Sequence, residues 1–184
     1  MITRILPPEA VHQGDLILVN AHHPCHPLPQ PDLVTVAGTG VQLERRAAQA
    51  LDSLMAAIDG WKGIVPVSGW RALAEQQAIW DGSLAENGLP FTQTYVACPG
   101  CSEHQTGLAI DLGLNQGEID FIRPAFPYEG LCQTFRQTMA QYGWVQRYPA
   151  GKEAITGIGH EPWHFRYVGQ PHAALMAERD LTLE

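Results

Sequence analysis

Residues 99–112 read PGCSEHQTGLAIDL and contain the first pair of residues suited to bind a metal ion. The aliphatic run at 108–112 predicts a strand, whereas the residues before it predict a loop. His104 and Asp111 are seven positions apart, so on one straight strand their side chains would face opposite sides. Both can reach a single ion only if the chain bends between them, and Gly107 permits such a bend. The alternative is a surface histidine beside an aspartate that caps a helix or a turn.

A second group of candidate ligands is the segment HEPWH at 160–164, which matches the pattern H-E-x-x-H. In zinc peptidases with this pattern, a helix brings the two histidines to one face and the glutamate acts as the base. Pro162 lies inside the segment, and the residues that follow alternate as in a strand, which argues against a helix. In the other interpretation the chain bends at Pro162, His164 is a ligand and Glu161 is the base. The histidine and aspartate described above would then complete the ligand set.

Two imidazoles and one carboxylate are a suitable ligand set for hydrolytic zinc, because three protein ligands leave a fourth position for water. Glu161 can take the proton of this water and return it to the leaving amine, provided that it lies within hydrogen-bond reach. Arg71 follows a predicted strand and opens a predicted helix, where it can stabilise negative charge on the carbonyl oxygen. The alternative is a solvated arginine at a helix start. Ser102 is expected either to hydrogen-bond a substrate carboxylate or to cap the local turn.

The rest of the chain is predicted to mix helices with strands around these groups, which is an α+β pattern. Apolar residues at helical spacing and glycines at segment ends predict helices at 43–61, 72–80 and 128–142. Alternating or β-branched segments predict strands at 64–68, 95–97, 108–112, 144–148 and 164–168. Pro66 favours an edge position for the first of these strands. We expect one domain that spans residues 1–184.

Composition narrows the possible partners. The 184 residues include 19 acidic and 11 basic side chains, and the net charge of −8 argues against nucleic acid or an anionic membrane as a partner. No apolar run approaches the ~20 residues that a membrane span requires, and residues 1–20 lack the apolar core of a signal peptide. We therefore expect a cytoplasmic protein with a small substrate. A chain of this length can fold without a metal, so a bound metal is expected to be functional.

The four cysteines give the main alternative to a hydrolytic site. Cys98 and Cys101 form a single C-x-x-C pattern, which is compatible with a redox pair or with half of a structural zinc site. In a reducing compartment we expect free thiols or ligands rather than disulfides. A metal clip at 22–26 is also conceivable from His22, His23, Cys25 and His26, although a proline-rich loop favours surface decoration.

Three segments in a fixed order resemble the zinc D-Ala-D-Ala peptidases, the VanX/VanY-like family. They are SGWRA at 68–72 with Gln76, the segment at 99–112, and EPWHFRYVG at 161–169. The similarity spans about residues 64–172 and is greatest to the bifunctional VanXY-type D,D-dipeptidases and D,D-carboxypeptidases of vancomycin resistance. An ordered set of three motifs is far more specific than any one short pattern.

The resemblance implies an activity and a ligand set. It implies hydrolysis of the terminal D-Ala-D-Ala bond in the free dipeptide, in peptidoglycan-precursor pentapeptides, or in both. It implies one Zn²⁺ per chain, held by His104, Asp111 and His164. Glu161 would be the general base, and Arg71 would stabilise the tetrahedral oxyanion. The partner would be a small peptide that ends in D-Ala-D-Ala.

The resemblance also implies a fold and a pocket. The fold would be a small α+β domain with a central antiparallel sheet flanked by helices, as in Hedgehog-like D-Ala-D-Ala metallopeptidases. His160 would not be a ligand. Trp70 and Ala72 differ from the tyrosine and serine that are usual in this family. The residues expected to line the pocket are Ser102, Gln76, Trp163, Ser68 and Trp70.

A binding module on the same scaffold, which recognises peptidoglycan peptides without cutting them, is a further alternative. Glu161 and Arg71 argue against it, because a pure binder needs neither a base nor an oxyanion clamp. The sequence leaves open the choice between dipeptide and pentapeptide, the acceptance of D-Ser at the terminus, and the oligomeric state.

Overall fold

The computed structural model describes residues 5–25, 30–36 and 38–184. Its centre is a four-stranded sheet, and every pair of neighbouring strands in it is antiparallel. In spatial order the strands are β3 (Ile64–Ser68), β4 (Ala109–Leu114), β6 (Glu161–Tyr167) and β5 (Trp144–Tyr148). The predicted central antiparallel sheet and α+β class are confirmed. β3 is an edge strand, as Pro66 predicts, because proline lacks the N–H that an inner strand would use.

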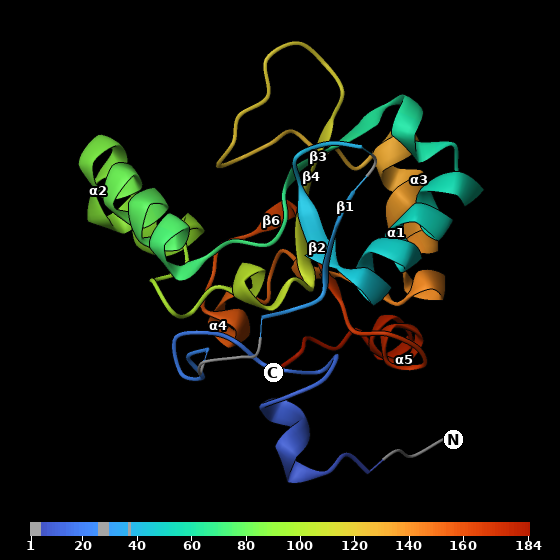
Figure 1. Cartoon of the computed structure of the whole chain (residues 1–184), viewed down its shortest axis with the longest axis horizontal. Coiled ribbons are helices and arrows are strands. Elements are labelled where there is room, and N and C mark those ends of the chain that lie inside the picture. The colour runs from blue at the N-terminus through green and yellow to red at the C-terminus, as the bar shows by residue number, and fades with distance from the viewer. Residues whose placement is uncertain (1–4, 26–29, 37) are drawn as a thin grey trace.

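Two amphipathic helices cover one face of this sheet (Figure 1). They are α1 (Arg45–Ala57) and α3 (Gly130–Met139), and both predicted helices are confirmed with shorter bounds. The side chain of Glu44 accepts hydrogen bonds from the first backbone N–H groups of α1 and so caps the helix. The buried faces of the two helices pack against the apolar residues of the sheet in one core. A 3-10 turn, Ala140–Tyr142, follows α3, and Gly143 ends it with a φ of 85°.

The predicted strand at 95–97 is wrong. The helix expected at 72–80 is α2 (Leu73–Tyr95), which lies on the other side of the sheet from α1 and α3 (Figure 1). The second half of this segment contains Gly82, Gly88 and Pro90, residues that disfavour a continuous helix. The structure accommodates them with a kink at Gly88, whose φ is 77°, and Pro90 follows in the first turn of the next helical piece. A proline there breaks no helical hydrogen bond.

The helical interpretation of H-E-x-x-H is also wrong, because Glu161–Tyr167 is the strand β6. β6 pairs with β4 only from His164 onward, so the missing N–H of Pro162 costs no hydrogen bond in that ladder. On its other side, β6 pairs with β5 through a register shift between Gln146 and Tyr148. The predicted strand at 164–168 therefore begins three residues earlier than expected.

The remaining elements are short and surround the sheet. They are the paired strands β1 (Leu33–Thr35) and β2 (Gln42–Glu44), the helices α4 (Glu153–Thr156) and α5 (His172–Arg179), and the 3-10 turns Pro8–Val11, Gly60–Lys62 and Glu103–Thr106. Within the described parts of the chain, no helix has the length and apolar character needed to cross a membrane.

Candidate metal centre

The chain bends between His104 and Asp111 as expected. The bend is the 3-10 turn Glu103–Thr106 followed by Gly107, whose φ of 73° is favourable only for glycine. The hydroxyl of Thr106 donates to the carbonyl of Glu103 (2.6 Å) and accepts from the N–H of Leu108 (3.0 Å), which fixes the turn. A Cβ atom at Gly107 would lie 3.0 Å from the backbone nitrogen of Glu44, so the turn also packs tightly against β2.

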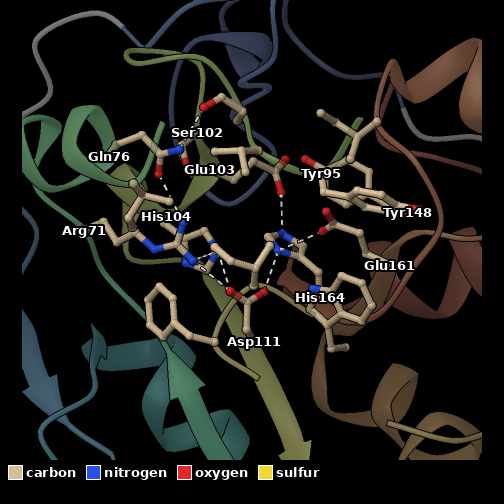
Figure 2. Close-up of a pocket in the computed structure, with 17 residues that line it drawn as sticks. Arg71, Gln76, Tyr95, Ser102, Glu103, His104, Asp111, Tyr148, Glu161 and His164 are labelled. Carbon is tan, nitrogen blue, oxygen red and sulfur yellow. Dashed lines mark hydrogen bonds and ion pairs between the residues drawn. The ribbon is translucent and has the colours of Figure 1, made fainter. Parts of the chain in front are cut away.

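Sheet pairing brings the second histidine to the aspartate. Asp111 on β4 and His164 on β6 are directly opposite each other, so their side chains share one face of the sheet. Nδ1 of His164 lies 2.9 Å from Oδ1 of Asp111, and Nε2 of His104 lies 3.2 Å from Oδ2 of Asp111. One ligand atom from each of the three residues lies within 4.8 Å of the other two, and all three residues are buried. Figure 2 shows these side chains converging.

The chemistry of these residues fits zinc. Nδ1 of His104 donates to the carbonyl of Gly69 (2.6 Å), which leaves Nε2 unprotonated and directed at the other two residues. Zinc bonds of about 2.0–2.1 Å in a tetrahedron place ligand atoms about 3.4 Å apart, and the two distances from the histidines to Asp111, 3.2 Å and 2.9 Å, are close to this value. His, His and Asp are a donor set that zinc prefers, and they leave one position open. Among the described residues, no other group of His, Cys, Asp or Glu brings three ligand atoms as close.

Burial and neighbouring charges affect the two histidines differently. Burial lowers the pKa of His104 to about 4, and the guanidinium of Arg71 acts in the same direction. Burial would also lower the pKa of His164, but the hydrogen bond to Asp111 and the nearby carboxylate of Glu103 outweigh it and raise this pKa to about 9. Burial would raise the pKa of Asp111, but its contacts with both histidines hold it well below the usual range. The two histidines differ because both ring nitrogens of His164 face carboxylates, whereas Nε2 of His104 faces Arg71 as well as Asp111.

Glu161 stands beside the three residues at the start of β6. Its Oε2 lies 3.7 Å from Nδ1 of His164. The side chain of Glu161 is buried, and it lines a cavity together with the three candidate ligands. Burial raises the pKa of Glu161 to about 8, against the opposing effect of His164. The carboxyl group thus lies beside the three candidate ligands, where a general base could exchange a proton with a water molecule that they hold.

All three nitrogens of the Arg71 guanidinium group donate hydrogen bonds that hold the side chain in the cavity. Nη2 donates to Oδ2 of Asp111 (2.8 Å), Nε donates to the hydroxyl of Ser68 (2.8 Å), and Nη1 donates to Oε1 of Gln76 (3.1 Å). The amide of Gln76 in turn donates to the carbonyl of Ala97 (2.8 Å). Ser68 and Gln76 therefore hold the arginine at the cavity, which excludes the solvated alternative.

The other expected pocket residues divide into two groups. Gln76, Ser102 and Trp163 line the cavity that also contains the metal-binding candidates, whereas Ser68 and Trp70 do not. The N–H of Trp70 donates to the carbonyl of Gln42 (2.7 Å) and anchors the turn before Arg71. The side chain of Ser102 makes no capping hydrogen bond.

Sequence analysis missed several residues that line the cavity. These residues lie on different elements and loops, and they form no recognisable sequence motif. They are Tyr95, Glu103, Phe121, Ile122, Tyr148 and Ile158. The ring of Tyr148 packs on His164 with 4.9 Å between the ring centres. The alternating residues at 144–148 predict a strand that contains Tyr148. The pairing of this strand with β6 then places Tyr148 beside the site.

The cysteines lie outside this centre. All four are free thiols, and Cys98 and Cys101 are the ends of a tight turn closed by a backbone hydrogen bond of 2.8 Å. Burial raises the pKa of Cys101 to about 12, which disfavours the thiolate that redox chemistry needs. Of the proposed clip at 22–26, His26 lies outside the described residues. Among the described residues, His22, His23 and Cys25 belong to no close group of metal ligands.

Comparison with known sequences identifies the family. The sequence model of VanY, described as D-alanyl-D-alanine carboxypeptidase, matches residues 40–170, more than half of the chain. The chain belongs to the VanY family. The family resemblance inferred from the three motifs is confirmed.

Named relatives and solved structures match the chain over most of its length. The bifunctional D-Ala-D-Ala dipeptidase and carboxypeptidase VanXYC of Enterococcus gallinarum is 43% identical over 92% of this chain and 91% of its own length. The vancomycin-resistance D,D-dipeptidase VanXYg, solved with a D-Ala-D-Ala phosphinate analog, matches with a TM-score of 0.91 and 50% identity over 97% of this chain and 72% of its own. A variant of the D,D-pentapeptidase VanY from the VanB-type cassette, solved with Zn(II), matches with a TM-score of 0.78 and 30% identity over 92% and 96%.

Proposed function

We propose that the chain is a zinc-dependent D,D-peptidase that hydrolyses the terminal peptide bond of D-Ala-D-Ala, in the free dipeptide, in peptidoglycan-precursor pentapeptides, or in both. The observation that carries this proposal is the convergence of His104, Asp111 and His164 beside Glu161 in a member of the VanY family. The activities named for VanXYC and VanXYg, and the Zn(II) in VanY, support the same substrate and metal. The proposal extends to a role in remodelling cell-wall precursors and in glycopeptide resistance.

In this proposal His104, Asp111 and His164 hold one zinc ion per chain. Nε2 is the ligand atom of His104, and Nδ1 is that of His164, because these nitrogens face the aspartate. The bound ion supplies a Lewis acid that polarises the scissile carbonyl and lowers the pKa of water. As a ligand, His164 would bind through Nδ1 in its neutral form.

Glu161 is the proposed general base and then the general acid. Its carboxylate accepts one proton from the water that attacks the carbonyl carbon. The same carboxyl group then returns the proton to the amine nitrogen as the peptide bond breaks, so that the residue ends in its starting state. Its burial beside His164 excludes bulk water from this transfer.

Arg71 is the proposed oxyanion donor. Its side chain already points into the cavity, and Ser68 and Gln76 limit its movement. A fixed cation at this position stabilises negative charge that develops on the carbonyl oxygen and needs little reorganisation. Ser102, Gln76 and Trp163 are the proposed contacts of the terminal D-residues, while Ser68 and Trp70 shape the turn that presents the arginine.

We further propose that the described segments form one domain over residues 1–184 and that it works in the cytoplasm. Arg147 and Arg166 connect the sheet to Glu184 and to the carbonyls of Asp15 and Ile17, which supports a single unit. Four free thiols suit a reducing compartment. Cell fractionation with a chain expressed in its own host tests the location, and recovery outside the cytoplasmic fraction would contradict it.

The experiment that tests the function measures D-Ala release by the zinc-loaded chain. The substrates are D-Ala-D-Ala and a muramyl pentapeptide that ends in it, and the matched controls end in L-Ala-L-Ala. We expect D-Ala release from at least one D,D substrate and no release from the L,L controls. A zinc-loaded chain that binds the D,D peptides but never cuts them would replace this proposal with the binding module.

A further inference from the structure

A buried carboxylate lies next to the ring nitrogen of His164 that points away from Asp111. Oε2 of Glu103 is 3.6 Å from Nε2 of His164, and both side chains are almost fully buried. Neither atom has a hydrogen-bond partner among the described residues. An acceptor and a potential donor thus face each other, and each is the other's available partner. Figure 2 shows Glu103 and Asp111 on different sides of the His164 ring.

Two arginines fix the other oxygen of Glu103. Nε of Arg147 and Nη1 of Arg166 donate to Oε1 at 2.8 Å and 2.9 Å, and both arginines are fully buried in the sheet. Because both cations share one oxygen, the carboxylate is held in a single orientation that directs Oε2 toward His164. Burial would raise the pKa of Glu103, but the two arginines hold it below the usual range.

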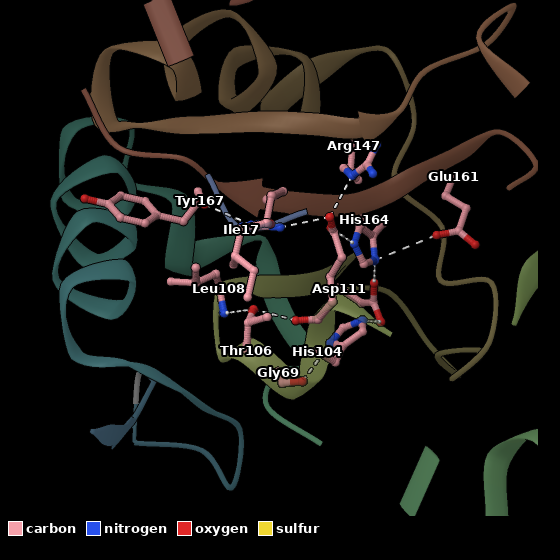
Figure 3. A network of polar contacts seen from close by, with 12 residues as sticks. Ile17, Gly69, His104, Thr106, Leu108, Asp111, Arg147, Glu161, His164 and Tyr167 are labelled. Atoms are coloured by element: carbon pink, nitrogen blue, oxygen red, sulfur yellow. Dashed lines mark hydrogen bonds and ion pairs between the residues drawn. The ribbon is translucent and has the colours of Figure 1, made fainter. Parts of the chain in front are cut away.

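The arginines are themselves anchored to distant parts of the chain. Arg147 makes two hydrogen bonds, of 3.0 Å and 2.6 Å, to the side-chain carboxylate of Glu184. Nη2 of Arg166 donates to the carbonyls of Asp15 and Ile17 at 2.9 Å and 2.8 Å. Two buried cations therefore meet two carboxylates. Through Glu103, this network connects Arg147 to His164, Asp111 and His104, which are labelled in Figure 3.

We propose that Glu103 is a positioning residue, which accepts a hydrogen bond from Nε2–H of His164 and thereby directs Nδ1 at the metal. The inference rests on the zinc centre proposed above. A histidine that ligates a metal commonly donates its other N–H to a carboxylate or carbonyl, which fixes the tautomer and the ring orientation. His104 has such a partner in the carbonyl of Gly69, and Glu103 gives His164 the equivalent one.

The competing explanation is that Glu103 only neutralises the buried arginines. Glu103→Gln and Glu184→Gln form a matched pair of variants, because each removes one carboxylate charge from Arg147 and only Glu103 faces His164. Zinc affinity is measured by competition with a chromophoric chelator, and the visible spectrum of the Co²⁺-substituted protein reports ligand geometry. We expect Glu103→Gln to bind zinc about 10- to 100-fold more weakly with a changed Co²⁺ spectrum. We expect native affinity and spectrum for Glu184→Gln. Equal effects of the two variants, or none, would overturn the inference.

A measurement on the unaltered protein keeps the inference testable if Glu103→Gln does not fold. Long-range ¹H–¹⁵N NMR on the zinc-loaded chain reports which nitrogen of His164 binds the ion. We expect a metal-bound Nδ1 and a protonated Nε2 in slow exchange with water. A metal-bound Nε2 in an active enzyme would overturn only the role of Glu103. A native chain that takes up no zinc would overturn both this role and the proposed function.

Discussion

At the scale of single residues, Glu161 and His164 occupy positions that a regular strand would turn to opposite faces. They are three residues apart on β6, yet Oε2 of Glu161 lies 3.7 Å from Nδ1 of His164. The cause is the register shift opposite Gln146 and Tyr148, where β6 uses more residues than its partner strand. The irregularity lets one short segment contribute both a metal-ligand candidate and a base candidate.

The variant Glu161→Gln tests the base. The amide matches the carboxylate in size but does not accept the proton from water, so we expect full zinc content with a kcat about 10²- to 10⁴-fold lower. Elemental analysis gives the zinc content, and D-Ala release from D-Ala-D-Ala gives kcat. A variant that retains near-normal turnover would remove Glu161 from the mechanism.

The variant Arg71→Lys tests the oxyanion donor. Lysine keeps the charge but not the fork of donors that contacts Ser68, Gln76 and Asp111, so we expect kcat to fall about 10²- to 10³-fold. Ser68→Ala is the matched control, because it removes one hydrogen bond to the guanidinium and leaves the donor itself. In steady-state kinetics, we expect Ser68→Ala to lower kcat much less than Arg71→Lys does. Similar kcat values for Arg71→Lys and the native chain would contradict the assignment.

At the scale of elements, a turn and a strand pair assemble the centre. The 3-10 turn Glu103–Thr106 brings His104 back over β4, and the pairing of β4 with β6 places Asp111 opposite His164. Gly107 connects the two elements with a positive φ and close contact to Glu44. The geometry of this turn therefore controls whether His104 meets the other two candidate ligands.

The variant Gly107→Ala tests the turn. The positive φ costs alanine about 1–2 kcal/mol, and the new Cβ would press on the backbone of Glu44 and shift His104. Gly151→Ala is the matched control, since Gly151 also has a positive φ (81°) but open space around its Cβ. We expect both variants to unfold at lower denaturant concentration and only Gly107→Ala to lose zinc affinity. Equal zinc affinity in the two variants would show that the turn tolerates the shift.

At the scale of the whole molecule, hydrogen bonds connect the sheet beside the candidate metal centre to residues 15–17 and to Glu184. Arg147 and Arg166 lie in the sheet between the centre and the segments that contain Asp15, Ile17 and Glu184. Buried charges of this kind are costly to leave unpaired, so the network holds these segments against the sheet. Occupancy of the metal site is therefore expected to affect the stability of the entire fold.

Metal removal tests this coupling. A ligand present at 100 times its Kd stabilises the folded state by about 2.7 kcal/mol. For a chain of this size, each kcal/mol of added stability raises Tm by roughly 2–4 °C. Thermal unfolding with and without a chelator should therefore differ by several degrees in the native protein. His104→Ala, which lacks one proposed ligand, should show no zinc by elemental analysis and no response to the chelator. Stoichiometric zinc in this variant would mean that the ligand set is wrong.

Much of the local structure was predictable because it depends on neighbours in sequence. Pro66 predicted an edge strand, Gly143 predicted the end of a helical segment, and Gly107 predicted the bend before β4. The extension of α2 was missed, since Gly88 and Pro90 usually end a helix and here only kink one. The roles given to the site residues by resemblance stay predictions, and the geometry supports them through distances rather than through motif spacing.

The sequence by itself determined the candidate ligands, the candidate base and the family, because these depend on residue types in a fixed order. The tertiary structure decided which atoms meet. Asp111 and His164 are 53 positions apart and come together only through the register of β4 with β6. Glu103 is 63 positions from Arg166 and 44 from Arg147, and nothing local marks it as a partner of His164. Contacts over such separations follow from strand pairing and from burying charges together, and those depend on the packing of the whole chain.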